Sequence, residues 1–434
     1  MAQLLSRAGY EEVVDPQRAH FLIVNTCGFI SSAKEESLNT LSGLAAGKGN
    51  GQVIIAAGCL VQRYGAEITK QVNGVDGILG TRHWTDIVKT VENLSTERSC
   101  SKLHQLETTH GDGQGVLHAS VQGKSAYLKI ADGCRRPCAF CAIPLIKGPP
   151  VSLPLDCAIA EACTLQAMGV REIILIAQDT TDYGYDLGLK NGLAHLLKKM
   201  TNAAPKVDWF RIMYAYPGYV SDELINVMAT NRQVVPYIDI PLQHAHPSTL
   251  RRMHRPTNVN QVRRTLEKMR RAIPSITFRT TFIVGYPDET EEEFQTLLDF
   301  VEEMHFDRVG AFKFSFEPGT PAESLGDPIP SELKEERYQR LMEKQQPISL
   351  ERNRTFIGKT LDVLVEGAGQ GISIGRSYRD APEIDGLVMI KGEIPVGKII
   401  AVRIIGAGTY DLNGVVEKVE KVQAACQKKP YSGE

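Results

Sequence analysis

The central half of the chain repeats a unit in which a short apolar run is followed by an amphipathic segment. Such runs are typical of buried strands, and apolar residues every three or four positions are typical of helices. Six of these units in succession predict an α/β fold whose parallel strands form an open or partial barrel. The strands are expected at residues 127–131, 172–177, 209–214, 235–240, 276–284 and 308–314. Helices are expected between them, including 157–168, 221–229, 259–272 and 291–304.

Three cysteines follow the first of these strands on one loop. Cys134, Cys138 and Cys141 are spaced C-x3-C-x2-C, and three thiolates can hold three irons of a 4Fe–4S cluster while the fourth iron stays open. A zinc loop and three unrelated core cysteines are the alternatives. Structural zinc sites have four ligands, and no second C-x2-C or H-x3-H follows in the sequence. The spacing therefore favours an iron–sulfur cluster.

Polar residues follow three of the later strands. Gln178 and Asp179 come after the second strand, Gln243 and His244 after the fourth, and the turn at Gly285 after the fifth. Each group alone could be an ordinary loop. Because function in such barrels lies at the carboxyl ends of the strands, we expect these residues to form the walls of one pocket together.

Residues 1–94 also alternate strands and helices. Two short apolar strands, 20–25 and 53–57, run almost directly into Cys27 and Cys59. In a parallel α/β layer, ligands gather at the carboxyl ends of strands, so the two thiols could meet in space. Two buried core thiols are the alternative, because free cysteine is among the most buried residue types. The spacing alone leaves both interpretations open, and the polar, Gly-rich residues 95–119 are interpreted as a linker.

The C-terminal part of the chain has a different pattern. A charged helix is expected at 331–354, followed at 355–422 by a Val-, Ile- and Gly-rich segment typical of a small all-β barrel, and by a tail at 423–434. Residues 356–420 contain seven Lys/Arg and nine Asp/Glu, a local charge of 7 − 9 = −2. Small barrels of this kind often bind oligonucleotides, but an acidic barrel is poorly suited to phosphates.

Composition limits the classes of function. A chain of 434 residues with 42% hydrophobic and 23% charged residues indicates a soluble protein of several domains. Its nine cysteines, an odd number, indicate a reducing cytoplasm rather than a disulfide framework. No uncharged apolar run is long enough to span a membrane. The net charge of −2 gives no global argument for nucleic-acid binding.

The cysteine loop resembles the signature of radical S-adenosylmethionine (SAM) enzymes, in which an aromatic residue, here Phe140, precedes the third cysteine. The resemblance implies that the open iron binds the methionine moiety of SAM and that a 5′-deoxyadenosyl radical is made there. The whole chain is similar to the radical-SAM methylthiotransferases. That family implies an N-terminal α/β methylthiotransferase domain at 1–94, a radical-SAM partial (β/α)6 barrel at 120–354, and a C-terminal TRAM barrel at 355–422. The motifs at 25–29, 58–64 and 134–141 carry this resemblance.

Other motifs resemble one branch of the family. Residues 176–180, 241–244, 375–378 and 381–386 look like the branch that methylthiolates an aspartate of protein twelve of the small ribosomal subunit. The alternative is the sister activity on tRNA adenosine. The acidic C-terminal barrel favours the first reading, because that ribosomal protein is expected to be basic. A second alternative is a truncated, catalytically impaired protein that still binds SAM or the ribosomal partner.

The family resemblance also implies roles for individual residues. Two 4Fe–4S clusters, SAM, and an electron donor such as flavodoxin or ferredoxin are expected, with no membrane partner and with RNA less favoured. The catalytic and radical-cluster ligands are Cys134, Cys138 and Cys141. The cofactor-binding residues are Phe140, Gln178, Asp179, Gln243, His244 and Gly285. Cys27 and Cys59 are expected to be two ligands of the auxiliary cluster.

The chain departs from the family pattern in two places. Members of the family open with a strand and a loop that carry a third N-terminal cysteine, whereas this sequence begins at what resembles the following helix. The first strand is therefore expected to be missing and the ligand set of the auxiliary cluster to be incomplete. Leu153 stands where the family usually has an arginine, which puts one substrate or cofactor contact in question.

Overall fold

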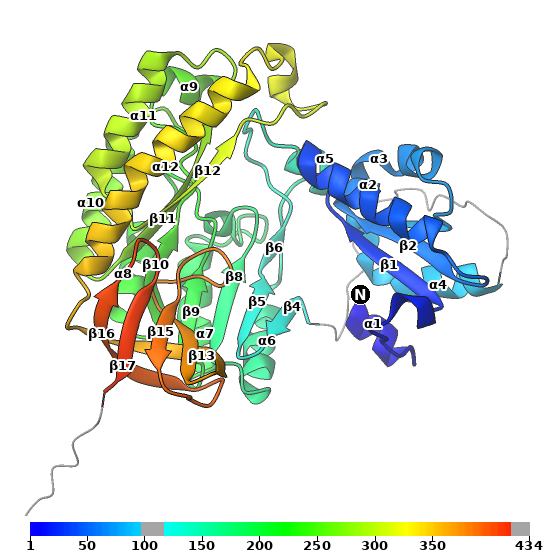
Figure 1. Ribbon diagram of the computed structural model, residues 1–434, viewed down its shortest axis with the longest axis horizontal. Coiled ribbons are helices and arrows are strands. Elements are labelled where there is room, and N and C mark those ends of the chain that lie inside the picture. The colour runs from blue at the N-terminus through cyan, green and yellow to red at the C-terminus, as the bar shows by residue number, and fades with distance from the viewer. Residues whose placement is uncertain (97–116, 418–434) are drawn as a thin grey trace, which may run out of the picture. The chain divides into compact units, whose positions relative to one another are not determined.

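The computed structural model describes residues 1–96 and 117–417 and divides into two compact units, Met1–Ile348 and Ser349–Glu434 (Figure 1). The expected tail and most of the expected linker lie outside the described residues. Among the described residues, no helix has the length and apolar character needed to cross a membrane.

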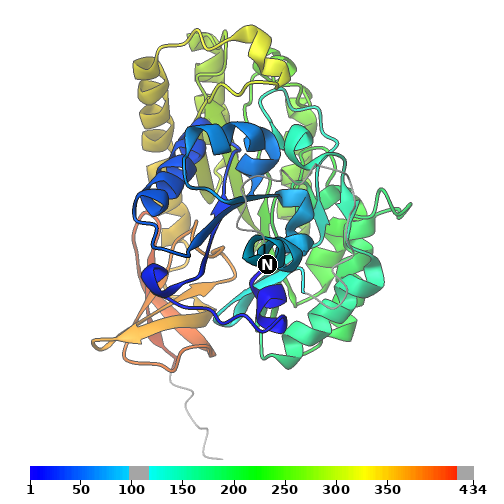
Figure 2. The same cartoon turned by 90° about the vertical axis from the view of Figure 1, so that its right-hand side faces the viewer.

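The first part of the chain forms a small parallel sheet. Strands β1 (Phe21–Thr26), β2 (Val53–Gly58) and β3 (Gly77–Gly80) pair in that order, which confirms both expected strands to within one residue. Helices α1 (Ala2–Arg7), α2 (Ser31–Ala46), α3 (Cys59–Gln71) and α4 (Ile87–Thr96) accompany it (Figure 2). Alternate residues of β2 belong to two separate apolar cores, so the sheet is buried on both faces, as parallel sheets are.

The middle of the chain builds a seven-stranded sheet. Its order is β12-β11-β10-β9-β8-β5-β4. All neighbouring strands are parallel except β4 (Ala119–Gln122), which runs antiparallel to β5. The parallel strands are β5 (Ser125–Lys129), β8 (Glu172–Ile176), β9 (Trp209–Ile212), β10 (Val234–Asp239), β11 (Thr277–Val284) and β12 (Arg308–Lys313). The sheet ends at β12 and β4 without closing, so the prediction of a partial barrel with six strand–helix units is confirmed.

Helices accompany the strands along the chain. They are α5 (Ile143–Lys147), α6 (Leu155–Ala167), α7 (Gly192–Ala203), α8 (Asp222–Thr230), α9 (Pro247–Arg252), α10 (Val259–Ala272), α11 (Glu291–Met304) and α12 (Ser331–Arg354). Helix α11 begins with a capping box in which the Thr290 side chain accepts from the backbone of Glu293 while the Glu293 carboxylate accepts from the backbone of Thr290. This reciprocal pair satisfies two backbone donors that the first helical turn cannot satisfy.

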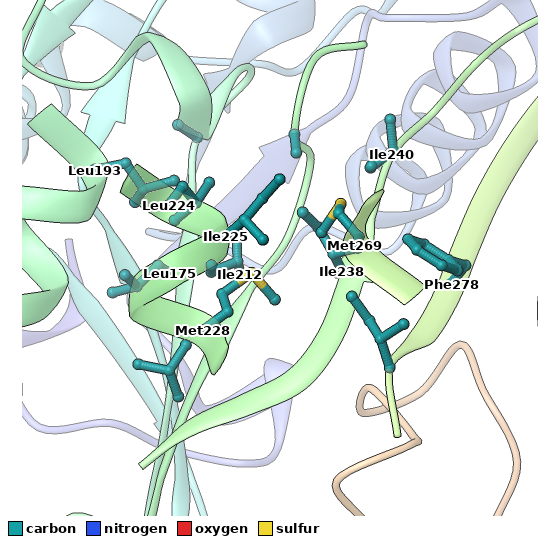
Figure 3. Packing of buried hydrophobic residues seen from close by; sticks show 14 of the residues in the cluster. Leu175, Leu193, Ile212, Leu224, Ile225, Met228, Ile238, Ile240, Met269 and Phe278 are labelled. Carbon is teal, nitrogen blue, oxygen red and sulfur yellow. The ribbon is translucent and has the colours of Figure 1, made fainter. Parts of the chain in front are cut away.

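The two faces of the barrel sheet differ in chemistry. Ile173 and Leu175 on β8 belong to the main apolar core, part of which Figure 3 shows between strands and helices. Glu172 lies on the other face, because successive residues of a strand point to opposite sides. Its carboxylate pairs with Arg211 of β9 at 2.8 Å, and both side chains are fully buried. The barrel interior therefore contains charge, whereas the layer between strands and helices is apolar.

One expected strand differs from the structure. Residues 127–131 were predicted as a single strand, but β5 starts at Ser125 and ends at Lys129, and a separate β6 (Ala131–Asp132) follows. β6 leaves the barrel sheet and pairs antiparallel with β7 (Val151–Ser152). The apolar run is continuous in sequence. Its pattern therefore could not reveal that its first part pairs within the barrel sheet and its second part pairs with β7.

The C-terminal unit is a five-stranded closed barrel, as predicted. Its strands are β13 (Thr360–Gly369), β14 (Ile372–Ser377), β15 (Val388–Lys391), β16 (Ile399–Ala407) and β17 (Leu412–Val416), in the order β13-β14-β15-β17-β16. Buried Val, Ile and Leu side chains from β13, β15, β16 and β17 fill it. Since closure leaves no unpaired strand edge, this small unit avoids edge-to-edge association.

The buried ion pair inside the larger barrel gives a stability prediction. We expect Glu172→Gln to lower the free energy of unfolding by about 3–5 kcal/mol, because it removes the carboxylate that faces the buried Arg211 guanidinium. The matched control is Glu303→Gln, which breaks the exposed ion pair with Arg263 and should cost less than about 1 kcal/mol. Urea unfolding followed by circular dichroism measures both. Equal losses in the two variants would contradict the assignment.

Candidate iron–sulfur and cofactor site

The three-cysteine loop is closed at its base by β6 and β7. Gly133 has a φ of +83°, and a Cβ there would lie 2.2 Å from the Pro149 carbonyl oxygen, so only glycine fits this crossing. The next residue, Cys134, donates its backbone N–H to Gly148 O at 3.0 Å. The two ends of the loop, at residues 133–134 and 148–149, are therefore in direct contact, and we call this contact the neck of the loop.

The far end of the loop is held by the barrel. Ala139 donates its N–H to Met253 O and accepts from the N–H of Ala322, both at 2.9 Å. Phe140 packs against the apolar cluster that contains Ala139 and Tyr286. The aromatic residue before the third cysteine therefore anchors the loop in the structure, and its contact with the cofactor stays a prediction.

The three thiols of the loop influence one another. Burial raises the pKa of the Cys134 thiol, and it raises that of Cys141 to about 12, with smaller contributions from the neighbouring thiols in both cases. Metal ligation requires thiolates, so binding of metal to these groups must release protons. Among the described residues, no three His, Cys, Asp or Glu side chains converge on the position of one ion. Three thiols on one short loop are a donor set that fits three irons of a 4Fe–4S cluster.

Two arginines between the cysteines tie the loop to the end of β8. Arg136 donates from Nε to Asp179 Oδ2 at 2.7 Å and from Nη2 to Asp182 Oδ1 at 3.2 Å. Arg135 donates from Nε to Asp182 Oδ2 at 2.7 Å. The Arg136, Asp179 and Asp182 side chains are all buried. Asp179, predicted to bind cofactor, is thus engaged in holding the cysteine loop, and Arg136 and Asp182 were missed by the sequence analysis.

Two of the predicted residues have polar atoms without partners at the carboxyl ends of the barrel strands, which we call the rim. Gln178 follows β8 and Gln243 follows β10. The side-chain Oε1 of each is buried and accepts no hydrogen bond from the part of the chain that the structure describes. Buried polar atoms are nearly always paired, so each oxygen fits a ligand donor. Tyr214, after the intervening β9, and Gln243 both adopt a positive φ, 57° and 73°, a conformation that clusters at functional sites.

His244 and Gly285 lie behind this rim. His244 is buried, its Nδ1 accepts the His246 N–H at 2.9 Å, and its Nε2 lies 3.5 Å from Glu289 Oε2. The Gly285 N–H donates to Glu289 Oε1 at 3.2 Å, and Arg337 donates to the same oxygen at 2.8 Å. Glu289 thus joins the loops after β10 and β11. These contacts make His244 and Gly285 supports of the rim, and their cofactor contacts stay predictions.

The structure brings the two N-terminal cysteines to adjacent strand ends. Thr26 pairs with Gly58 in register, and the next residues are Cys27 and Cys59. Two close approaches require glycine: a Cβ on Gly28 would lie 2.6 Å from Leu60 Cα, and one on Gly58 2.5 Å from Thr26 O. Cys27 is exposed and Cys59 half-buried, so the alternative of two buried core thiols does not hold.

Cys59 also lies beside the elements that carry the radical loop. Burial raises the pKa of its thiol, while Lys147 acts to lower it. Lys147 ends α5, the helix that starts two residues after Cys141, and its Nζ lies 2.7 Å from Asp132 Oδ1 and 3.5 Å from Thr81 Oγ1. The two cysteine regions are therefore neighbours within the first unit.

A buried ion pair fixes the Cys27 loop to the segment after β12. Arg63 donates from Nη1 to Glu317 Oε2 at 2.6 Å and to Gly28 O at 3.1 Å. Its Nη2 donates to Pro318 O at 2.5 Å. The Arg63 and Glu317 side chains are only 6% and 5% exposed. One guanidinium therefore contacts both the loop with the N-terminal thiol and the barrel segment.

Three sequence families match this arrangement. The Radical SAM superfamily matches residues 128–301, the TRAM domain residues 357–416, and the uncharacterised protein family UPF0004 residues 1–80. Among solved structures, the radical S-adenosylmethionine methyltransferase TsrM from Kitasatospora setae, with cobalamin and a 4Fe–4S cluster bound, is similar with a TM-score of 0.51 and 12% identity. The similarity covers 82% of this chain and 66% of that one. At this identity the likeness concerns the fold alone.

The sequence relatives are much more similar. The chain is 47% identical over 435 residues to the ribosomal protein uS12 methylthiotransferase RimO of Chloroflexus aurantiacus, which covers 95% of both chains. It is 44% identical over 438 residues to the protein of the same name from Roseiflexus sp., covering 95% of this chain and 93% of the relative. Identity at this level over nearly the full length of both proteins shows that the chain belongs to the radical-SAM family of ribosomal protein uS12 methylthiotransferases.

Proposed function

We propose that this protein replaces an unactivated C–H bond of a uS12 aspartate side chain with C–S–CH3. The observation that carries the proposal is a cysteine loop with cluster spacing at the carboxyl end of β5, in a chain whose relatives over 95% of its length are uS12 methylthiotransferases. The family also implies a 4Fe–4S cluster and SAM. Sulfur insertion at a saturated carbon needs a cofactor-derived radical, which no side chain supplies.

In this proposal Cys134, Cys138 and Cys141 hold the radical cluster. When bound, the cluster and SAM supply the hydrogen-abstracting radical. The chain's own residues position and shield them: the neck at Gly133 and the Arg136–Asp179 ion pair fix the loop. The buried Oε1 atoms of Gln178 and Gln243 accept from donor groups of SAM.

A tRNA substrate is the alternative, and the C-terminal barrel argues against it. Its residues 356–420 have a charge of −2, which repels phosphate. Ile374 of β14 and Met389 of β15 are directly opposed and each is 40% exposed. Exposed apolar side chains on an acidic surface suit a basic protein better than a nucleic-acid backbone. A catalytically impaired protein is the second alternative, and it predicts SAM binding without product.

Cys27 and Cys59 are the proposed ligands of the auxiliary, sulfur-carrying cluster. Their adjacency at strand ends, and the contact between α3, which begins at Cys59, and α5 of the barrel, support this role. We further propose that flavodoxin or ferredoxin supplies electrons and that the protein acts in the cytoplasm, where ribosomal proteins and reduced thiols are found.

The radical cluster is tested by genetic complementation. We expect mass spectrometry of uS12 to show the methylthio group in cells with the wild-type gene and none in cells without it or with Cys138→Ala, because three ligands leave no redundancy. Cys157→Ala, an exposed cysteine outside the loop, is the control and should restore the modification. Modified uS12 in the Cys138→Ala strain would contradict the proposal, and modified tRNA adenosine with unmodified uS12 would support the alternative.

The N-terminal thiols are tested by separating the two half-reactions. We expect Cys59→Ala to keep 5′-deoxyadenosine formation within about twofold of wild type but to lose methylthiolation, because its thiol lies outside the radical loop. Product analysis after anaerobic reconstitution measures both quantities. The proposed sulfur-carrying role would be wrong if Cys59→Ala methylthiolated uS12 at the wild-type rate.

Substrate choice is tested on exposed acids of the C-terminal barrel. Asp380 is unsuitable, because it is buried and accepts from Ser377 at 2.8 Å, whereas Asp362 and Glu383 are exposed. We expect Asp362→Lys with Glu383→Lys to slow association with uS12 at low salt, and the difference from wild type to shrink as salt rises. Stopped-flow binding measures the on-rate, and Asp362→Asn with Glu383→Gln should show an intermediate effect. A salt-independent on-rate equal to wild type would reject the electrostatic part of the proposal.

A further inference from the structure

Arg255 is a buried cation whose hydrogen-bond partners include no carboxylate. Its side chain follows α9, and the residue is 8% exposed. Buried charges in proteins are normally paired. Four other buried arginines, Arg136, Arg211, Arg337 and Arg376, each bond a carboxylate. Within residues 1–96 and 117–417, no carboxylate lies within ion-pair distance of Arg255.

The groups that Arg255 does contact surround Cys138. Its Nη1 donates to Cys138 Sγ at 3.5 Å, and its Nη2 donates to the Pro241 carbonyl oxygen. The guanidinium lies over the Tyr216 ring, 4.2 Å from the centroid. Its Nε is buried and has no hydrogen-bond partner among the described residues. The unpaired positive charge is therefore directed at one sulfur of the proposed radical cluster.

Tyr216 approaches the same sulfur from a different element. It follows β9, is 8% exposed, and places its hydroxyl 3.8 Å from Cys138 Sγ. By contrast, Cys134 accepts from the backbone N–H of Arg136 at 3.4 Å, and the backbone N–H of Ile143 acts on Cys141. Cys138 thus differs from the other two ligands in that its sulfur contacts two side-chain groups, the Arg255 guanidinium and the Tyr216 hydroxyl, although the charge of Arg255 also acts on Cys141.

We propose that Arg255 and Tyr216 set the reduction potential of the radical cluster through Cys138, with Arg255 as the counter-ion of the cluster. This inference rests on the proposed function, since it requires that the three cysteines bind a 4Fe–4S cluster. Hydrogen bonds and positive charge near a ligand sulfur stabilise the more negative, reduced cluster and raise its potential. Both residues are positioning residues: they act on the cluster through its ligand.

The step concerned is a one-electron transfer. An external low-potential reductant, titanium(III) citrate in the test, is oxidised by one electron, and the cluster core passes from 2+ to 1+. No covalent bond forms or breaks. The charge on the cluster becomes more negative by one unit. The buried guanidinium therefore stabilises the reduced cluster more than the oxidised cluster.

The test is a potentiometric titration of the reconstituted full-length protein, followed by electron paramagnetic resonance in the absence of SAM. We expect Arg255→Gln to lower the equilibrium constant for reduction about tenfold, which is about 59 mV for one electron. Arg255→Lys should recover part of the shift, and Tyr216→Phe should give a smaller shift in the same direction. The matched control is Arg263→Gln, which removes the same charge from an exposed ion pair and should leave the potential unchanged.

The outcomes separate the inference from the proposed function. A wild-type protein that binds no cluster through its three-cysteine loop refutes the proposed function. A wild-type-like potential in Arg255→Gln, with full iron and sulfide content, refutes only the inference. An unchanged potential with weakened SAM binding also overturns it and assigns Arg255 to the SAM carboxylate. If Arg255→Gln loses the cluster, Tyr216→Phe decides, because it keeps the charge and the ring: an unchanged potential there overturns the proposal.

Discussion

The fixed position of the cysteine loop is the constraint on which the rest of the site depends. A loop with three cysteines has no core of its own, so the barrel must hold it. The β6–β7 pair holds its base, and the buried Arg136–Asp179 ion pair holds its middle. Burying two charges gives little net stability, because desolvation offsets their attraction. A buried charge that loses its partner is strongly destabilising, however. The ion pair therefore favours the one loop conformation in which Arg136 and Asp179 remain in contact.

The partial barrel explains why the polar groups of the rim share one location. Gln178, Tyr214 and Gln243 follow three neighbouring parallel strands, so their positions are set by strand order and not by distance along the chain. Tyr214 and Gln243 adopt left-handed backbone conformations, each costing of the order of 1–3 kcal/mol. The apolar layer between strands and helices stabilises the fold enough to maintain that strain.

Local patterns were sufficient to predict the strands of the partial barrel, the helix at 291–304 and the closed C-terminal barrel. They did not predict the contacts of Asp179 with Arg136, 43 residues apart, or of Arg255 with Cys138, 117 residues apart. Such pairs leave no periodic signal, because each partner looks like an ordinary loop residue in its own segment. The same limit explains why the sequence did not reveal the protein partners of Asp179 and His244; their cofactor contacts stay predictions.

In the proposed function, the contacts of the N-terminal sheet bear on how sulfur reaches the radical site. Helix α3, which begins at Cys59, contacts α5, which ends at Lys147, and Arg63 links the Cys27 loop to Glu317. These contacts are mostly polar, and polar contacts are directional in a way that apolar packing is not. They therefore specify the orientation of the N-terminal thiols toward the barrel more than they add stability. An enzyme that makes a reactive radical needs that accuracy, because its second reactant must already be in place when the radical forms.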